Sequence, residues 1–276
     1  MIGHIEAINI RRSIRNYSKE KLDSNLIEKI NALLSTPKIG PFDNKPRFVL
    51  IEKPKAREQE KVRLGTYGFI DNAAYFIGGC IEKSAFSEVD YGYSLQRIII
   101  ELTRLGLGTC WLGGSFRRKD YRKLLNTQKN EIIPCITPVG YKSTKKSRRE
   151  RLGLVFSDGS LRKDFNTFFF ENNFETPIIF NPEDNYHKAL EAVRKAPSAM
   201  NKQPWRVLKI EDKYHFYLKR DSIVGTTKAS DLQKVDMGIA LANFKLALEE
   251  LNIQGKWHIA DPNIGNLEYI ITSVKS

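Results

Sequence analysis

The stretch Val89-Asp90-Tyr91-Gly92 opens a long, largely apolar segment that closes at Trp111, and the same pattern returns at Val235-Asp236-Met237-Gly238 and closes at Trp257. In both copies the aspartate and the glycine are 2 positions apart, and the aspartate and the tryptophan are 21 positions apart. Apolar residues also coincide at 8, 12, 15 and 17 positions after the aspartate. Two amphipathic helices share some periodicity by chance, but not this ungapped frame. We therefore predict two long core helices, one in each half of the chain, related by an internal duplication.

The segments around these helices alternate between helix and strand patterns, which predicts an α+β fold. Asp23 or Ser24 can cap a helix whose apolar residues run from Leu26 to Leu34, and Pro37 follows it. Further helices are predicted over residues 54–64, 95–105, 119–125, 164–170, 186–195 and 232–251. Strands are predicted over residues 48–51, 75–81, 132–141, 207–210, 214–218, 257–259 and 267–274.

A break in composition separates the two copies of the pattern. A basic run covers residues 142–151, and a segment with glycine and serine follows over residues 152–160. We place the boundary there, with a first unit over residues 1–155 and a second over residues 156–276. Each unit is expected to contain a central sheet and one long core helix.

Composition narrows the class of protein. The chain has 276 residues, of which 41% are hydrophobic and 28% charged, and its formal net charge is +13. The charge calls for an anionic partner, which nucleic acid, a membrane surface or a phosphorylated cofactor could supply. No nucleic-acid-binding motif and no stretch of 18 apolar residues occurs, so we expect neither a nucleic-acid nor a membrane partner.

Cysteine and histidine usage points to a reduced, metal-free protein. The three cysteines are odd in number and lack C-x-x-C spacing, and the four histidines are scattered. That pattern suits free thiols in a reducing compartment and predicts no metal site. With no signal peptide recognisable at the N-terminus, we expect a cytoplasmic location.

Two polar stretches could bind a ligand. Arg11-Arg12-Ser13-Ile14-Arg15 offers three guanidinium groups and a hydroxyl, which are groups that hold phosphate, although a solvated helix end would have the same composition. The second stretch, Ala196-Pro197-Ser198-Ala199-Met200-Asn201-Lys202-Gln203-Pro204-Trp205, lies roughly 180 residues further on.

Together the two stretches resemble the flavin-binding signatures of the nitroreductase family, RRSxR and APSxxNxQPW. Members of that family are usually homodimers with two FMN sites at the interface, each built from one signature of either subunit. The resemblance implies a nitroreductase-like fold whose two halves pack as a pseudo-dimer within one chain. The reciprocal site would need Pro37–Pro41 and Glu175–Phe180, which lack the required groups. One FMN per chain and a monomeric protein are therefore expected.

The resemblance assigns cofactor contacts residue by residue and implies no metal ligand or catalytic side chain. Phosphate and ribityl contacts fall on Arg11, Arg12, Ser13 and Arg15, with a second phosphate clamp on Lys146 and Arg148. Contacts with the flavin ring fall on Leu112, Gly113 and Gly114 from the first half and on Pro197, Ser198, Ala199 and Asn201 from the second. Three alternatives stay open: Gly113-Gly114 as a plain turn, Asn201 as a brace for its loop, and residues 142–151 as a solvated charged loop.

The activity that the resemblance implies is FMN-dependent oxidation of NAD(P)H. In a ping-pong cycle, hydride passes through flavin N5 to a nitroaromatic, a quinone or a similar acceptor. The sequence does not indicate whether NADH or NADPH is the donor. The chain has no G-x-G-x-x-G after a strand, so a dinucleotide-binding fold is not expected. Two other functions remain compatible with the sequence: flavin binding without turnover, and a basic interaction protein on the same scaffold.

Overall fold

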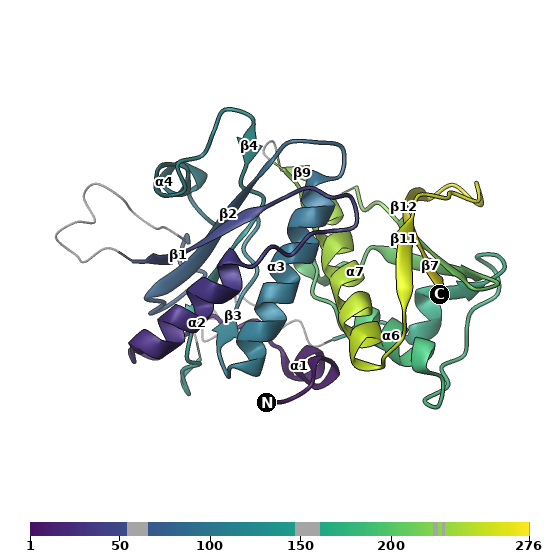
Figure 1. Cartoon of the computed structure of the whole chain (residues 1–276), viewed down its shortest axis with the longest axis horizontal. Helices are drawn as coiled ribbons and strands as arrows, with labels where there is room; N and C mark the ends of the chain where they lie inside the picture. Colours follow the sequence, from purple (N-terminus) through teal and green to yellow (C-terminus); the bar gives the residue numbers. More distant parts are fainter. Residues whose placement is uncertain (54–65, 147–160, 223–225, 228–229, 276) are drawn as a thin grey trace.

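The computed structural model describes residues 1–53, 66–146, 161–222, 226–227 and 230–275. Two long helices, α3 (Ser87–Arg104) and α7 (Leu232–Glu250), lie side by side at the centre of the molecule. One sheet flanks the pair on the side of α3 and a second sheet flanks it on the side of α7 (Figure 1). The prediction of an α+β fold is confirmed.

The first sheet has the strand order β1-β2-β5-β3, and β4 pairs with β2 beside this path. All of its pairs are antiparallel. The elements of this half, besides α3, are α1 (His4–Ile10), α2 (Ser24–Ser35), β1 (Arg47–Glu52), β2 (Tyr75–Glu82), β3 (Gly108–Thr109), α4 (Arg118–Leu124), β4 (Glu131–Ile132) and β5 (Ile136–Gly140).

The second sheet has the strand order β11-β12-β8-β7-β6, and only its β6–β7 pair is parallel. The elements of this half, besides α7, are η2 (Phe165–Thr167), β6 (Phe169–Glu171), α6 (Asn185–Arg194), η3 (Ala199–Asn201), β7 (Trp205–Ile210), β8 (Lys213–Leu218), β9 (Thr226–Thr227), β10 (Ser230–Asp231), β11 (Gly255–His258) and β12 (Glu268–Lys275).

Four strands of each sheet follow one scheme. The order β1-β2-β5-β3 corresponds to β7-β8-β12-β11, and every neighbour in both paths is antiparallel. In each half the long helix follows the second strand of the scheme, directly in the first half and after the short strands β9 and β10 in the second. A shorter helix, α2 or α6, precedes the first strand. The two halves thus place their long helices equivalently.

The central helices approach each other closely at two glycines. A Cβ atom at Gly92 of α3 would overlap the backbone carbonyl oxygen of Val235, and a Cβ atom at Gly238 of α7 would overlap that of Val89. The contact is reciprocal, because each glycine meets the residue that lies three positions before the other glycine. Only glycine permits this separation between the two backbones.

Most of the predicted elements are confirmed. The long helices contain residues 95–105 and 232–251 apart from one terminal residue each, and Asp23 caps α2 by accepting a hydrogen bond from the Leu26 N–H at 2.7 Å. The strand predicted over 132–141 is divided into β4 and β5, because Pro134 lacks the N–H that a continuous ladder needs.

The helix predicted over residues 164–170 is wrong. The structure has a short 3₁₀ turn there, followed by β6, which pairs in parallel with β7. The run of phenylalanines suits a strand beside a buried neighbour better than a helix. The helix predicted over 54–64 and the boundary near residue 155 lie outside the described residues and stay predictions.

The helix crossing generates a testable prediction. Gly238→Ala should destabilise the protein by on the order of 2 kcal/mol, because the added methyl group forces α3 and α7 apart. Gly114→Ala is the matched control, since a Cβ atom there meets nothing within 4 Å and should leave stability nearly unchanged. Urea unfolding of both variants measures the difference, and equal stability of the two variants would contradict the crossing.

Candidate cofactor site between the two halves

A cavity of about 570 Å³ lies between the two halves, on one side of the central helix pair. Its lining comes from five parts of the chain: the segment after α1, the loop after residue 66, the strands around β3 and β5, the loop around η3, and the first two turns of α7. The lining residues are Arg11, Ser13, Arg15, Phe69, Cys110, Trp111, Gly113, Cys135, Pro197, Ser198, Ala199, Met200, Asn201, Leu232, Val235, Asp236 and Ile239.

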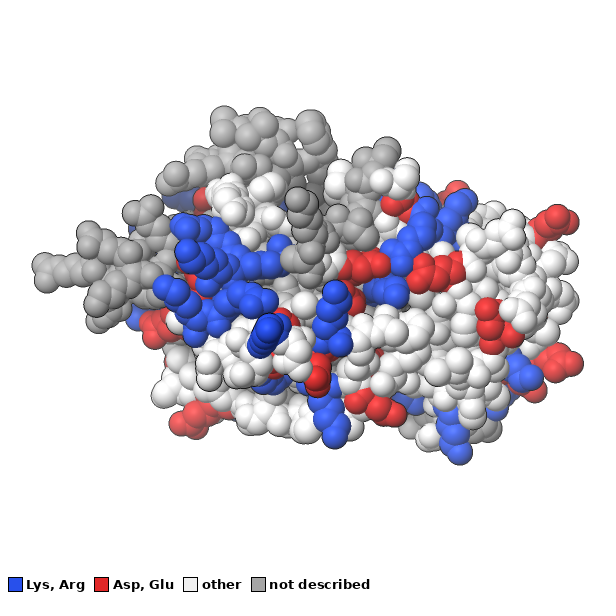
Figure 2. Space-filling view, turned by 90° about the horizontal axis from the view of Figure 1, so that it is seen from above, with Lys and Arg blue, Asp and Glu red and all other residues white. Residues whose placement is uncertain are grey.

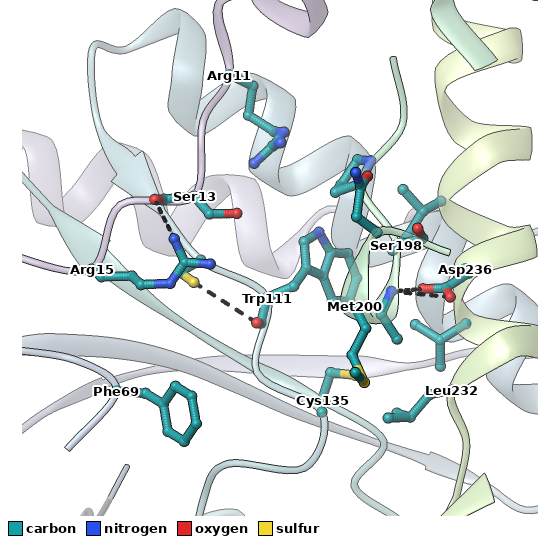
Figure 3. Close-up of a pocket in the computed structure, with 17 residues that line it drawn as sticks. Arg11, Ser13, Arg15, Phe69, Trp111, Cys135, Ser198, Met200, Leu232 and Asp236 are labelled. Atoms are coloured by element: carbon teal, nitrogen blue, oxygen red, sulfur yellow. Dashed lines mark hydrogen bonds between the residues drawn. The ribbon is translucent and has the colours of Figure 1, made fainter. Parts of the chain in front are cut away.

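The first-half signature enters the cavity as an extended segment. Ser13 pairs with Thr109 in a parallel bridge, and the N–H of Ile14 donates to the Thr109 carbonyl at 2.8 Å. This pairing ties the segment to β3 and places Arg11 and Arg15 in the cavity wall (Figure 3). Arg11 is only 4% exposed, so its charge lies in a largely dry environment where an anion would bind strongly.

Arg12 lies differently from its neighbours. Its side chain is exposed and does not line the cavity. Its Nη1 donates to the carbonyl oxygens of Asn9 at 2.7 Å and Arg11 at 2.9 Å, which closes the C-terminal end of α1. The assignment of Arg12 as a phosphate contact stays a prediction, and the structure offers a local role for its guanidinium group.

The second-half signature forms a tight loop around η3. Met200, Asn201 and Gln203 all have φ near +50°, the left-handed region that non-glycine residues rarely adopt. Hydrogen bonds hold the loop in this state: the Ser198 hydroxyl accepts the Gln203 N–H at 2.9 Å. Strain of this kind is found where a loop must present a defined surface to a ligand.

Asn201 both lines the cavity and braces its own loop. Its amide oxygen accepts a hydrogen bond from Arg162 at 3.0 Å, and its amide nitrogen donates to the Leu161 carbonyl at 2.8 Å. The side chain is therefore engaged with the segment before η2. This arrangement agrees with the structural alternative for Asn201 while leaving its position in the cavity wall intact.

The glycine-containing turn after β3 contributes one of its three predicted residues. Gly113 lines the cavity, whereas Leu112 is buried and exchanges both backbone hydrogen bonds with Ile136 at 3.0 Å. Gly114 is exposed and is not part of the lining. The guanidinium of Arg118 fixes this turn by donating to three carbonyl oxygens, those of Gly113 at 2.5 Å and of Ile133 and Pro134 at 3.1 Å.

Of the predicted second phosphate clamp, the structure describes only Lys146, and this residue does not line the cavity. Lys146 is exposed and absent from the lining, and its carbonyl oxygen accepts a long hydrogen bond of 3.4 Å from Asn16. Arg148 lies outside the described residues. The assignment of both residues stays a prediction.

Nine lining residues were not predicted from the sequence. Four of them, Leu232, Val235, Asp236 and Ile239, follow the i, i+3, i+4, i+7 spacing of a single helix face. In the sequence, this spacing predicts a helix face packed in the core, and only the neighbouring signature points to a ligand. The others are Phe69, Cys110, Trp111, Cys135 and Met200, which carry no polar pattern.

The two ends of the cavity differ in charge. Arg11, Ser13 and Arg15 lie at one end, Asp236 and Leu232 of α7 lie opposite, and Trp111 stands between them (Figure 3). Burial raises the pKa of Asp236 well above its ordinary value and also raises the pKa of the Cys135 thiol. The cavity can therefore hold an elongated ligand with an anionic tail and a flat, apolar head.

The described residues contain neither a metal-binding cluster nor a membrane-spanning helix. Among the residues that the structure describes, no group of three or more His, Cys, Asp or Glu side chains is arranged to hold a metal ion. Within the same residues, no helix combines the length and apolar character needed to cross a membrane.

Comparison with known proteins places the chain in a family. Residues 4–248 match the family model described as "Putative TM nitroreductase". Two curated proteins named "Putative NADH dehydrogenase/NAD(P)H nitroreductase" are each 27% identical. The one from Methanothermobacter thermautotrophicus matches over 53% of this chain and 81% of its own length. The one from Archaeoglobus fulgidus matches over 51% of this chain and 87% of its own length.

A solved structure shows the same fold over nearly the full length. The crystal structure of a nitroreductase from Thermotoga maritima, itself described as putative, aligns with 99% of this chain and 94% of its own, with a TM-score of 0.61 and 20% identity. The family model matches far more than half of the chain, and the fold agrees with it. The chain belongs to the nitroreductase family that this model describes.

Proposed function

We propose that this chain is an FMN-dependent oxidoreductase that takes a hydride from NAD(P)H and reduces a nitroaromatic, a quinone or a similar acceptor. The observation that carries the proposal is the composite cavity, in which Arg11–Arg15 of the first half faces Pro197–Asn201 of the second. Membership of the nitroreductase family and the names of the two archaeal relatives support it.

The cavity suits FMN in size and in the order of its lining groups. Its volume of about 570 Å³ lies within the range of roughly 300–1,000 Å³ found for small-molecule sites. Guanidinium groups at one end match a phosphate, and the apolar side chains of Trp111, Val235 and Ile239 match a ring system. Bound FMN would supply the hydride-accepting chemistry that amino-acid side chains lack.

The residues that would hold the cofactor have distinct tasks. Arg11 and Arg15 would bind the phosphate through charge-assisted hydrogen bonds, with Ser13 as a further donor. Pro197, Ser198, Ala199 and Asn201 would line the cofactor from the second half. Gly113 would keep side-chain bulk out of the slot, because a Cβ atom there would already press on Leu232 at 2.7 Å.

We further propose that the chain is a fused pair of family subunits with one surviving site. The shared strand scheme of the two sheets supports this proposal. The proposed boundary near residue 155 would divide the pair. At the reciprocal position, Phe86 stands where Leu232 stands in the cavity, and Phe42 stacks on it at 4.1 Å with the rings 6° from parallel. On this proposal, the aromatic stack would take the place of a second ligand. Such a chain already contains the family's dimer interface, so it should be monomeric.

Surface charge supports an anionic reductant. Figure 2 shows Lys and Arg side chains gathered on one side of this face, over the region where α4 lies. The exposed cations of α4 and of the residue before it are Arg117, Lys119, Arg122 and Lys123. The adjoining Arg118 donates to the carbonyl oxygen of Gly113, which ties α4 to a turn that lines the cavity. The field of these cations would raise the local concentration of NAD(P)H.

Substitution of the arginines separates the residues that line the cavity from the one that does not. Arg15→Ala or Arg11→Ala should weaken FMN binding by about 10- to 100-fold, because each removes a charge-assisted hydrogen bond to phosphate. Arg12→Ala should weaken it less, since this guanidinium bonds to the carbonyls of Asn9 and Arg11. Quenching of FMN fluorescence measures the affinities, and an equal loss in all three variants would count against the assignment.

Reduction of bound FMN by NAD(P)H tests whether the protein is an oxidoreductase. Under anaerobic conditions, the yellow colour of the FMN complex should bleach on addition of NADPH or NADH and return when a quinone is added. Colour that persists with both nucleotides would favour flavin binding without turnover. Protein that binds no FMN at all would overturn the proposal and leave the basic-interaction alternative.

A further inference from the structure

The cavity contains a buried carboxyl group that the proposed function does not yet use. Asp236 lies in the second turn of α7, is 3% exposed, and forms part of the cavity wall. Both of its oxygens lie within hydrogen-bonding distance of the Ala199 N–H, at 3.0 and 3.1 Å (Figure 3). The group therefore anchors the loop that presents Met200 and Asn201 to the cavity.

The equivalent aspartate of the first half provides an internal comparison. Asp90 accepts three hydrogen bonds: from the Phe42 N–H at 3.1 Å, the Asn44 N–H at 2.9 Å and the Asn44 amide at 2.8 Å. It is fully buried and does not line the cavity. At Asp236, by contrast, a single N–H donor is found among the described residues. A carboxyl group has lone pairs for about four donors, so Asp236 keeps capacity for a ligand.

The surroundings of Asp236 favour its neutral form. Burial raises its pKa, and the nearby Asp231 carboxylate raises it further, against the lowering effect of the Ala199 N–H. From α3, Glu88 accepts a hydrogen bond from the Asp231 N–H, which adds another acidic group on that side. From the strand side, the Cys135 thiol also has a raised pKa and brings no positive charge. A neutral carboxyl group can donate a proton.

We infer that Asp236 is a further catalytic residue, whose carboxyl group donates the proton that an acceptor needs when it is reduced in this cavity. The inference rests on the proposed function. Bound FMN would supply the hydride of NAD(P)H, with NAD(P)⁺ as the oxidised product, and a quinone that accepts this hydride at one oxygen is left with its second oxygen as an anion. That second oxygen takes the proton from Asp236 to give the hydroquinone. The carboxylate then recovers a proton from solvent.

Asp236→Asn tests the proton separately from the loop anchor. The amide oxygen of asparagine can still accept the Ala199 N–H, but the side chain has no acidic proton. Reoxidation of the reduced holoprotein by benzoquinone at pH 7 should slow by about 100-fold, in the range typical of a lost general acid. Bleaching by NADPH should change by less than about 3-fold, because that step needs no proton from this group. The wild-type reoxidation rate should fall as the pH rises through the pKa of Asp236, because the carboxylate has no proton to donate. This fall should be absent in Asp236→Asn.

A second readout does not depend on activity. In cofactor-free protein at pH 7, the infrared spectrum of the wild type should contain a protonated-carboxyl C=O band that Asp236→Asn lacks. Asp90→Asn is the matched control. It should lower the stability of the protein but retain the infrared band, and its reoxidation rate should stay within about 3-fold of the wild-type rate. If Asp236→Asn does not fold, wild-type protein labelled with ¹³C-aspartate can report the same protonated carboxyl by NMR.

The outcomes are distinguishable. Reoxidation at the wild-type rate in Asp236→Asn, or an ionised Asp236 at pH 7 in the infrared or NMR measurement, would overturn the inference even if FMN binding and bleaching succeed. Failure of FMN binding or bleaching in the wild type would instead overturn the proposed function. The spectroscopic measurement would then still report the protonation of Asp236.

Discussion

The close crossing of α3 and α7 is the constraint on which the rest of the structure depends. Gly92 and Gly238 let each helix backbone touch the carbonyl oxygen of the turn before the other glycine. That contact fixes the first two turns of the helices relative to each other, and those turns carry Asp90 and Asp236. Each aspartate in turn holds a loop of its own half, around Phe42 or Ala199. The positions of the two loops thus depend on the close helix contact that Gly92 and Gly238 permit.

The two long helices have different surroundings at the loops that their aspartates hold. On the side of α7, the anchored loop, the arginine segment and the Gly113 turn surround a cavity. On the side of α3, the loop held by Asp90 carries Phe42, whose ring stacks on that of Phe86. Both aspartates are buried, but their partners differ. Burial raises the pKa of Asp90 to about 6 against the lowering effect of three hydrogen bonds. Burial also raises the pKa of Asp236, which has one N–H donor among the described residues and the cavity beside it. Asp90 thus only holds its loop, whereas Asp236 holds its loop and also lines the cavity.

Sequence reasoning succeeded where a pattern has a direct physical cause and failed where tertiary contacts decide. The long helices and most strands follow from periodicity. Eight of the thirteen residues assigned from the family signatures line the cavity, and their contact with a cofactor stays a prediction. The direction of Arg12 could not be predicted, because neighbours in an extended segment point to opposite sides and pairing with Thr109 decides which. Cys110 and Cys135 gave no signal, since buried strand residues look alike whether they face a core or a ligand. The prediction of a helix over 164–170 is wrong because pairing with β7, which is distant in the sequence, makes part of this segment a strand.

The central claim is that one composite site, built from both halves, survives in each chain. The most direct test is the stoichiometry of FMN binding, measured by absorption against protein concentration after saturation and removal of free cofactor. The account predicts one FMN per chain of 31.7 kDa. Two FMN per chain would show that the position of Phe42 and Phe86 is a working site, and no bound FMN would show that the arginine segment and the Pro197–Asn201 loop do not form a flavin site. Either result would contradict the account.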